Sequence, residues 1–461
     1  MRYDLAVIGG GPGGYTAAAA AAQAGLQVVL FEKDLLGGTC LNRGCIPTKA
    51  MLHTAEIWSE MQQADTMGLH AEGLAFDWAA VLARRSAAVD TLRHGVEQLM
   101  KTGGVTVVSG TAVVTGEGTV QCGEVCYEAA DIVIAAGAAP ALPPIPGREL
   151  PGVCTSDDLL EGESSRPASL VIIGGGVIGV ELAGAYSAFG CQVTIVEAMD
   201  RLLPGLDREL GQRLAAQFKK QGVGVAVKSS VQQITREGEL LTVAYTDARG
   251  NTASVTAGKV LIATGRRPHA EALFSGEYRP AFSRGGIVAD EAGRTALPHL
   301  YVIGDAKAGN IQLAHLAEAQ GKNVVAAILG KPLPVDTALV PSCIYTNPEI
   351  ASIGMSEQQA KEAGLAVCCG KALSGANGRC VIAGCGAGFV KLVCEAGSGR
   401  LLGAQLCWPR ATDLISELAL AIRQHLTAAE LAGLIHPHPT FSEGVQEAAW
   451  QVLHRLDASH R

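Results

Sequence analysis

Cys40 and Cys45 are the two residues of this sequence best placed to do chemistry together. They stand five positions apart in the segment GGTCLNRGCIPTKA, residues 37–50, with a glycine pair before them and Lys49 after them. A thiol near a helix start or a lysine has a lowered pKa, and thiol–disulfide exchange needs such a thiolate beside a second thiol. The segment therefore favours a redox-active dithiol.

Two other interpretations of the pair stay open. A structural zinc site takes four ligands, usually from two closely spaced Cys or His pairs. The sequence offers no matching second pair, because Cys368 and Cys369 are contiguous and Cys122 and Cys126 lack a comparable glycine setting. We therefore expect no bound metal. Two buried thiols that are close by coincidence remain the simplest alternative, but they leave the surrounding glycines and lysine unexplained.

The segment HPHPTFSE, residues 436–443, contains residues that could act as a base. Two histidines separated by a proline could ligate a metal or lie on the surface without a function. Imidazole is also suited to deprotonate a dithiol substrate near neutral pH. A carboxylate bonded to the far ring nitrogen, such as that of Glu443, would fix the tautomer and raise the basicity of the ring.

Two glycine-rich motifs lie between a predicted strand and a predicted helix. They read IGGGPGG at residues 8–14 and IGGGVIG at residues 173–179, and each helix leads into a second apolar strand. An acid, Glu32 or Glu197, ends that strand 23 positions after the first glycine. This is the context of the dinucleotide fingerprint, in which glycines admit the pyrophosphate and the acid binds the ribose. One copy alone could be an ordinary glycine turn, but two copies predict two dinucleotide sites.

The second acid bears on the choice of cofactor. A carboxylate at Glu197 fits a free 2′-hydroxyl and repels a 2′-phosphate, and no basic cluster surrounds the nearest cation, Arg201. We therefore expect NAD rather than NADP at the second motif.

The elements around the motifs predict an α/β fold with two Rossmann-like dinucleotide-binding domains. Beyond residue 340 the glycine motifs stop, and the mixed strands and helices predict an α+β C-terminal dimerisation domain. The expected domains are a discontinuous FAD-binding domain, residues 1–145 and 270–335, an NAD-binding domain, residues 146–269, and an interface domain, residues 340–461.

Composition excludes several functional classes. The 461-residue chain has a net charge of −8 and no block of Lys or Arg, so a nucleic-acid partner is not expected. The apolar stretch over residues 5–31 is broken by glycines and a proline, so neither a membrane span nor a leader peptide is expected. Thirteen scattered cysteines, an odd number, do not form a secreted disulfide framework and favour the cytoplasm.

Taken together, these motifs resemble those of the class I pyridine-nucleotide disulfide oxidoreductases over essentially the whole chain. The resemblance adds IATGRRP at 262–268, YVIGDA at 301–306, YTNPEIASIG at 345–354 and HPHPTFSEGVQEA at 436–448. Within that family, IPTK at 46–49 and the lack of a second cysteine pair at the C-terminus are similar to the members that oxidise dihydrolipoyl groups with NAD⁺.

The resemblance implies a role for each reactive residue. Cys40 would be the interchange thiol that meets the substrate disulfide, and Cys45 would lie against the flavin as the charge-transfer thiolate. Lys49 would lie near the flavin, paired with Glu181. His438, with Glu443 as its partner, would be the base and would come from the second subunit of a homodimer.

The resemblance also implies two sets of cofactor contacts. The set for FAD is Gly9, Gly11, Gly14, Glu32, Gly38, Thr39, Lys49, Ala112, Asp305, Leu313, Ala314 and His315. The set for NAD is Gly174, Gly176, Gly179, Glu197, Val231 and Gly265.

The expected function is oxidation of protein-bound dihydrolipoyl groups by way of the Cys40–Cys45 disulfide, FAD and NAD⁺. The expected partner is a lipoylated protein of a 2-oxoacid, acetoin or glycine-cleavage system. The first alternative is a reductase of the same fold for another disulfide or a metal ion, and the second is a non-catalytic FAD/NAD-binding redox sensor or scaffold. Two departures from the family pattern stand out, Gln320 in place of a glutamate and the Trp408-Pro409-Arg410 segment.

Overall fold

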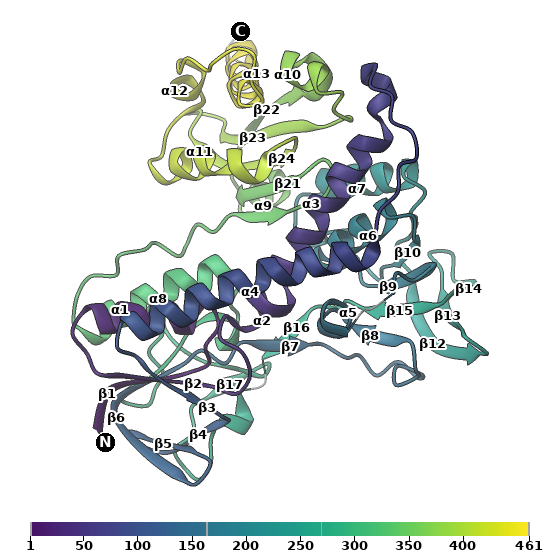
Figure 1. Cartoon of the computed structure of the whole chain (residues 1–461). Helices are drawn as coiled ribbons and strands as arrows, with labels where there is room; N and C mark the ends of the chain where they lie inside the picture. The colour runs from purple at the N-terminus through teal and green to yellow at the C-terminus, as the bar shows by residue number, and fades with distance from the viewer. Residues whose placement is uncertain (1, 163–164, 269, 460–461) are drawn as a thin grey trace.

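The computed structural model describes residues 2–162, 165–268 and 270–459. Three main bodies of mixed helix and strand follow one another in Figure 1, which confirms the α/β fold class. In the part of the chain that is described, no helix is both long and apolar enough to cross a lipid bilayer.

The first body is built on a seven-stranded sheet in the order β3-β2-β1-β6-β5-β4, with β19 also paired to β6. Strands β1, β2, β3, β6 and β19 run parallel, as expected where helices cover the sheet. The strands are β1 (Arg2–Ile8), β2 (Val28–Glu32), β3 (Thr106–Ser109), β4 (Ala112–Gly116), β5 (Thr119–Cys122), β6 (Val125–Ile134) and β19 (Leu300–Val302). The helices are α1 (Pro12–Gln23), α2 (Gly38–Arg43), α3 (Cys45–Gln62), α4 (Trp78–Thr102) and α8 (Ala314–Ile328).

The second body contains a five-stranded parallel sheet in the order β11-β10-β9-β15-β8 and an antiparallel sheet β12-β13-β14. Its strands are β8 (Val153–Thr155), β9 (Ser169–Ile173), β10 (Gln192–Val196), β11 (Gly224–Ala226), β12 (Ser230–Glu237), β13 (Leu240–Thr246), β14 (Thr252–Ala257) and β15 (Lys259–Ile262). Its helices are α5 (Ser156–Gly162), α6 (Val177–Ala188) and α7 (Arg208–Lys220). A two-stranded ribbon, β7 (Ala138–Pro140) with β16 (Arg266–Pro268), joins the first two bodies.

Because β19 lies between the second body and the C-terminus in sequence yet pairs with β6, the chain returns to the first sheet after completing the second. Short elements surround this return: η2 (Glu271–Leu273), β17 (Phe282–Ser283), β18 (Gly286–Ile287) and η3 (Gly304–Ala306). The domain limits given above stay a proposal.

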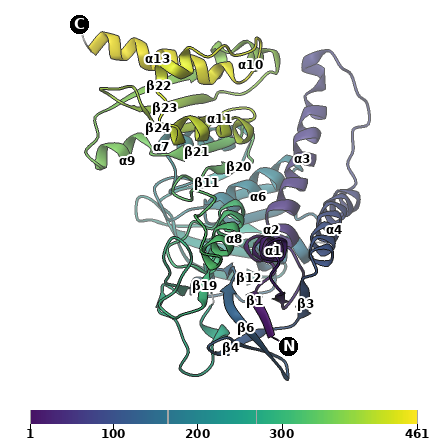
Figure 2. The same cartoon turned by 90° about the vertical axis from the view of Figure 1, so that its left-hand side faces the viewer.

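The C-terminal body is a five-stranded antiparallel sheet in the order β20-β21-β24-β23-β22. Its strands are β20 (Ser342–Ile344), β21 (Ile350–Gly354), β22 (Val367–Leu373), β23 (Phe389–Glu395) and β24 (Leu401–Cys407). Its helices are α9 (Glu357–Glu362), α10 (Gly378–Ile382), α11 (Ala411–Arg423), α12 (Ala428–Ala432) and α13 (Glu443–Ser459). Figures 1 and 2 place this body above the other two, with α13 at its outer end.

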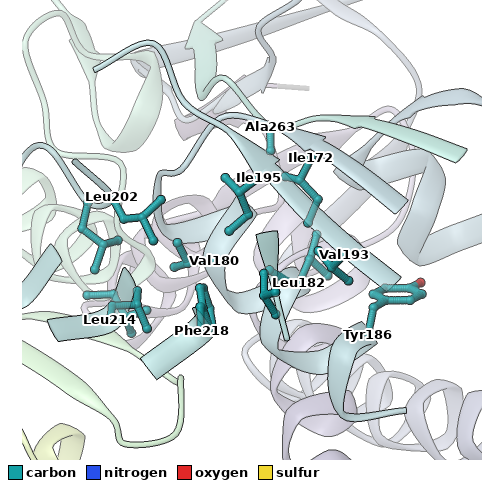
Figure 3. Packing of buried hydrophobic residues seen from close by; sticks show 14 of the residues in the cluster. Ile172, Val180, Leu182, Tyr186, Val193, Ile195, Leu202, Leu214, Phe218 and Ala263 are labelled. Carbon is teal, nitrogen blue, oxygen red and sulfur yellow. The ribbon is translucent and has the colours of Figure 1, made fainter. Parts of the chain in front are cut away.

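One hydrophobic cluster runs through the second body and into its neighbours. Figure 3 shows its centre, where Ile172 and Ile195 of the sheet pack with Val180 of α6 and Phe218 of α7. The same cluster includes Met51 of α3, Ile344 of β20 and Phe389 of β23. Burial of apolar surface therefore fixes α3 and the C-terminal sheet against the second body.

A buried lysine adds an ionic contact between the second and C-terminal bodies. Lys391 of β23 lies 2.8 Å from both Glu209 and Glu357 and 3.4 Å from Asp207. Burial alone would lower the pKa of Lys391, but these carboxylates raise it above its usual value. Hydrogen bonds from Lys361 and Lys391 lower the pKa of Glu357 to about 2. The carboxylates therefore stabilise the charge of Lys391, and the two lysines stabilise the charge of Glu357 in turn.

We expect Lys391→Met to lower the free energy of unfolding by about 3–5 kcal/mol, because it leaves three carboxylates without their buried cation. Lys361→Met is the matched control, since Lys361 makes an exposed contact one helical turn away from the same Glu357. The control should leave the free energy of unfolding almost unchanged, because solvent screens an exposed ion pair. Urea unfolding of both variants measures the difference, and equal losses would contradict a structural role for the buried lysine.

Candidate active site

The two cysteines of the redox segment lie at a helix junction. Helix α2 ends at Arg43, Gly44 links the two helices, and α3 begins at Cys45. Cys40 is thus within α2, and Cys45 lies at the positive end of the α3 dipole. Neither is bonded in a disulfide, and both are partly buried. The junction brings into contact two thiols that are five positions apart in the sequence.

Glycine packing fixes this junction against the first glycine motif. Gly38 has φ +58°, and a Cβ atom on it would lie 2.7 Å from the Cα atom of Gly11. No larger residue fits there without moving the backbone. The redox segment and the first dinucleotide turn therefore pack closely, backbone against backbone.

The environment makes the two thiols electrostatically unequal. A hydrogen bond from Cys40 and the positive charge of Lys49 hold the pKa of Cys45 below its usual value, against the effect of burial. Donation of that hydrogen bond, together with burial, raises the pKa of Cys40. In the reduced pair, Cys45 therefore loses its proton more readily than Cys40.

Lys49 connects the dithiol to the second body. Its ammonium group lies 2.9 and 2.8 Å from the two carboxylate oxygens of Glu181 in α6. Glu181 is buried and also accepts a 3.0 Å hydrogen bond from the backbone N–H of Tyr345, whose ring lies 4.8 Å from the ammonium group. Burial would lower the pKa of Lys49, but Glu181 raises it, so the ammonium group stays charged beside Cys45.

His438 and Glu443 form the expected pair within the C-terminal body. The Nδ1 atom of His438 lies 2.8 Å from a carboxylate oxygen of Glu443, and the other oxygen accepts a 2.7 Å hydrogen bond from the Thr440 N–H. These two hydrogen bonds lower the pKa of Glu443. The His438 side chain is exposed. The other histidine of the segment, His436, is buried against Glu417 instead.

The unusual Trp408-Pro409-Arg410 segment packs against the loop that carries His438 and leads into α13. Trp408 is fully buried, and its indole N–H donates a 3.0 Å hydrogen bond to the carbonyl of Phe441. A Cβ atom on Gly444 would lie 2.7 Å from the indole ring, so the ring lies directly under the start of α13. Trp408 is therefore a packing residue of the loop that carries His438.

The His438–Glu443 pair lies far from the dithiol of the same chain (Figures 1 and 2). Figures 1 and 2 both place α2 at the junction of the lower bodies and α13 at the far end of the C-terminal body. Among the described residues, His438 forms a hydrogen bond with Glu443, and no hydrogen bond or ion pair joins it to Cys40 or Cys45. The His438–Glu443 hydrogen bond forms within one chain, but both residues are distant from the thiols of that chain.

Both glycine motifs fit a dinucleotide in the same way. A Cβ atom on Gly14 would lie 1.8 Å from the carbonyl oxygen of Gly9, and one on Gly179 would lie 2.1 Å from that of Gly174, so the helix packs directly on the turn. A Cβ atom on Gly176 meets nothing within 4 Å, which leaves room for a ligand against the backbone. The glycines thus serve two purposes: some allow close packing, and others keep space open.

The two acids hold these turns in matching ways. Glu32 accepts hydrogen bonds from the N–H groups of Gly10 (2.7 Å) and Asp34 (2.9 Å). Glu197 accepts from those of Gly175 (2.5 Å) and Met199 (2.6 Å). Each carboxylate oxygen keeps a lone pair for a ribose hydroxyl. Arg201, the nearest cation in sequence to Glu197, is engaged by Asp200 and the carbonyl of Pro204.

The remaining predicted contacts are spread over both bodies. Asp305 lies in η3 directly after β19, where burial raises its pKa and the charge of Arg266 opposes that rise. Gln320 accepts a 2.8 Å hydrogen bond from the Gly304 N–H and donates to Asn310, so the departure from glutamate keeps this turn in place. The others are Thr39 in α2, Ala112 in β4, Leu313 at the N-cap of α8, Ala314 and His315 in its first turn, Val231 in β12, and Gly265 at φ +101°.

Three side chains near the dithiol were not predicted from residue types and their spacing. Arg266 donates to Asp157 at 2.7 Å and to the Thr39 hydroxyl at 3.2 Å, which links the second body to α2. Tyr15 donates a 3.2 Å hydrogen bond to Glu318, and burial with this carboxylate raises the pKa of Tyr15. Arg266 lies in IATGRRP, so that motif was its only signal, whereas Tyr15 and Glu318 had none.

The inequality of the two thiols can be tested by pH. We expect Lys49→Met to raise the pKa of Cys45, because the variant removes the nearby positive charge. Glu181→Gln should shift the pKa in the opposite direction, because the Glu181 carboxylate raises it. The measurement is the rate of Cys45 alkylation against pH in the reduced protein, read by mass spectrometry. Shifts of the same sign in both variants would contradict the assignment.

Comparison with known proteins agrees with the fold and with the site. Residues 3–321 match the model of the pyridine nucleotide-disulphide oxidoreductase family, and residues 340–449 match the model of its dimerisation domain. A dihydrolipoyl dehydrogenase of Bacillus subtilis (strain 168) is 37% identical over 97% of each chain. One of Chlorobaculum tepidum is 38% identical over 99% of this chain and 98% of its own.

Solved structures lead to the same family. The copper(II) complex of the HOCl-induced flavoprotein disulfide reductase RclA from Escherichia coli superposes with a TM-score of 0.88 at 28% identity, covering 98% of this chain and 100% of its own. The family models, the relatives and the structure confirm the expectation of an oxidoreductase that uses FAD and NAD. The chain therefore belongs to the pyridine nucleotide-disulphide oxidoreductase family.

Proposed function

We propose that the protein is a dihydrolipoyl dehydrogenase, which oxidises protein-bound dihydrolipoyl groups to lipoyl groups with NAD⁺ as the acceptor. The observation that carries the proposal is the unequal dithiol: Cys45, whose pKa is lowered, lies beside the charged Lys49, and the pKa of Cys40 is raised. Relatives that carry this name match the chain over nearly its whole length.

The cycle begins with Cys40 and Cys45 joined in a disulfide. His438 of the partner subunit takes a proton from one thiol of the substrate, and the resulting thiolate attacks the sulfur of Cys40. A mixed disulfide forms, and Cys45 leaves as a thiolate, which Lys49 stabilises. The second substrate thiol then attacks the substrate sulfur of the mixed disulfide, which closes the lipoyl ring and releases Cys40. Two electrons have passed to the dithiol. The proton of the first substrate thiol is on His438, and the proton of the second has passed to Cys40.

The chain holds its cofactors through the two glycine motifs. FAD would lie against Gly11, Glu32, the Gly38–Thr39 start of α2 and Asp305, and NAD against Gly176 and Glu197. When bound, FAD and NAD⁺ supply the two-electron acceptors that re-oxidise the dithiol. The free lone pairs of Glu197 and the engagement of Arg201 by Asp200 support NAD over NADP.

The dimerisation domain supports a homodimer. The distance between the His438–Glu443 pair and the dithiol of the same chain supports a site shared between two subunits. We further propose a cytoplasmic location and a lipoylated protein of a 2-oxoacid, acetoin or glycine-cleavage system as the partner. A reductase for a different disulfide or a metal ion is the second candidate, because a copper(II)-bound disulfide reductase has the same fold.

The experiment is a steady-state assay of the FAD-loaded protein that follows NADH formation from dihydrolipoamide and NAD⁺. His438→Gln should lower kcat by about 10²–10⁴-fold, the usual contribution of a general base. Glu417→Gln, which removes the partner of the buried His436, is the matched control. A bound flavin that NADH reduces but dihydrolipoamide does not would favour the second candidate. Failure of the protein to bind FAD would favour neither candidate and would contradict the enzyme assignment.

Two substitutions can separate the two roles of the second glycine motif, which are close packing of the helix and open space for the cofactor. We expect Gly176→Ala to weaken NADH binding by about tenfold or more, equal to 1.4 kcal/mol, with no change in the unfolding midpoint, because its Cβ fills only open space. Gly179→Ala places its Cβ against the carbonyl of Gly174 and should cost about 1–3 kcal/mol of stability. Calorimetric titration and urea unfolding measure both effects. If Gly176→Ala lowered stability and Gly179→Ala weakened NADH binding instead, Gly176 would not face the cofactor.

A further inference from the structure

A second pair of thiols in contact lies in the C-terminal body, outside the site described above. Cys380 is in the short helix α10, and Cys385 follows the end of that helix. Cys380 is 1% exposed, and Cys385 is partly exposed. The two are five positions apart, the same spacing as Cys40 and Cys45. Neither thiol takes part in the proposed function.

The end of α10 brings the two side chains together. Gly384 adopts φ +62°, the N–H of Cys385 donates a 2.9 Å hydrogen bond to the carbonyl of Cys380, and the N–H of Gly384 donates to that of Val381. These two bonds and the left-handed glycine define a Schellman motif, in which the residues at the positions of Cys380 and Cys385 pack against each other. Usually both are hydrophobic, but in this chain both are cysteines.

This backbone turn places the two thiol groups within hydrogen-bonding distance of each other. The Cys380 thiol donates a hydrogen bond to the sulfur of Cys385. Burial and the neighbouring Cys385 raise the pKa of Cys380 to about 12. Burial also raises the pKa of Cys385, while the hydrogen bond from Cys380 and the charge of Arg379 oppose that rise. Cys385, which is both the more exposed and the more acidic thiol, is the one that would react first.

Helix α10 is also tied to the segment that carries His438. Asn377 caps the helix by accepting a hydrogen bond from the Cys380 N–H, and it donates one to the carbonyl of Thr440 at 3.0 Å. The Arg379 guanidinium lies 5.6 Å from the centre of the Phe441 ring. The dithiol therefore belongs to the structure that supports the loop of the His438–Glu443 pair.

We propose that Cys380 and Cys385 form a second redox-active dithiol, which low-molecular-weight disulfides oxidise reversibly to an intramolecular disulfide. The Cys385 thiolate attacks one sulfur of the small disulfide, forms a mixed disulfide and displaces one small thiolate. The Cys380 thiolate then attacks the sulfur of Cys385, forms the Cys380–Cys385 bond and displaces the second small thiolate. Two electrons pass to the small disulfide, and the two protons pass to the thiolates that leave.

The test uses the wild-type holoenzyme in glutathione buffers with increasing ratios of glutathione disulfide to glutathione. Remaining thiols are alkylated, and the protein is digested with trypsin without reduction. Cleavage after Arg379 and Lys391 gives the peptide CVIAGCGAGFVK, residues 380–391, with these two cysteines and no others. The disulfide removes two hydrogen masses from that peptide and prevents alkylation of both sulfurs. The Cys40–Cys45 disulfide joins peptides 34–43 and 44–49 and serves as the internal positive control.

We expect the oxidised form of peptide 380–391 to increase with the glutathione disulfide ratio and to disappear after dithiothreitol. Below the pKa of Cys385, its rate of formation should rise about tenfold per pH unit, because the thiolate is the attacking species. In Cys380→Ala, Cys385 should keep a glutathione adduct, because no second thiol displaces it. In Cys45→Ser the second pair should still oxidise, which separates this inference from the proposed function.

Two results would overturn the proposal. In the first, peptide 380–391 carries two alkyl groups at every ratio that oxidises the Cys40–Cys45 pair. In the second, wild-type Cys385 keeps the same glutathione adduct that it keeps in Cys380→Ala, which would show that Cys380 cannot reach the mixed disulfide. The first result does not depend on the folding of a variant, because it is read from the wild-type protein alone.

Discussion

The contact between Lys49 and Glu181 is the interaction on which the arrangement of the site depends. A buried carboxylate is stable only when its charge is paired and its remaining lone pairs are bonded. Glu181 meets both conditions, with two contacts to the ammonium group and one to the backbone of Tyr345. Because Lys49 belongs to α3, Glu181 to α6 and Tyr345 to the C-terminal body, one ion pair fixes all three parts around Cys45.

The same interaction sets the direction of the chemistry. The hydrogen bond from Cys40 is the main cause that lowers the pKa of Cys45, and the charge of Lys49 adds to it. Lys49 stays charged because Glu181 stabilises the charge. An unequal dithiol is what a relay needs, since one sulfur must exchange with a substrate disulfide while the other holds negative charge. Structural stability and reactivity thus rest on the same group of charges.

Much of the fold and of the site could be predicted because short-range patterns determine them. Gly14 and Gly179 are required by steric contact with the turn before them, so the motif is visible in the sequence. The role of Trp408 could not be predicted, because its hydrogen bond to Phe441 joins residues 33 positions apart. The contact between Arg266 and Thr39 spans 227 positions, so the sequence pattern could not predict it either. Patterns report local geometry, whereas these contacts depend on how the bodies pack.

The two cysteine pairs show why spacing alone does not define a reactive site. Both have four residues between their thiols, but Cys45 begins an 18-residue helix beside a lysine, whereas Cys385 follows the end of a five-residue helix. The first setting lowers a thiol pKa and the second raises both. Low pKa values favour fast exchange, and high values favour slow exchange. The same spacing therefore suits a turnover site in one place and a slowly responding thiol pair in the other.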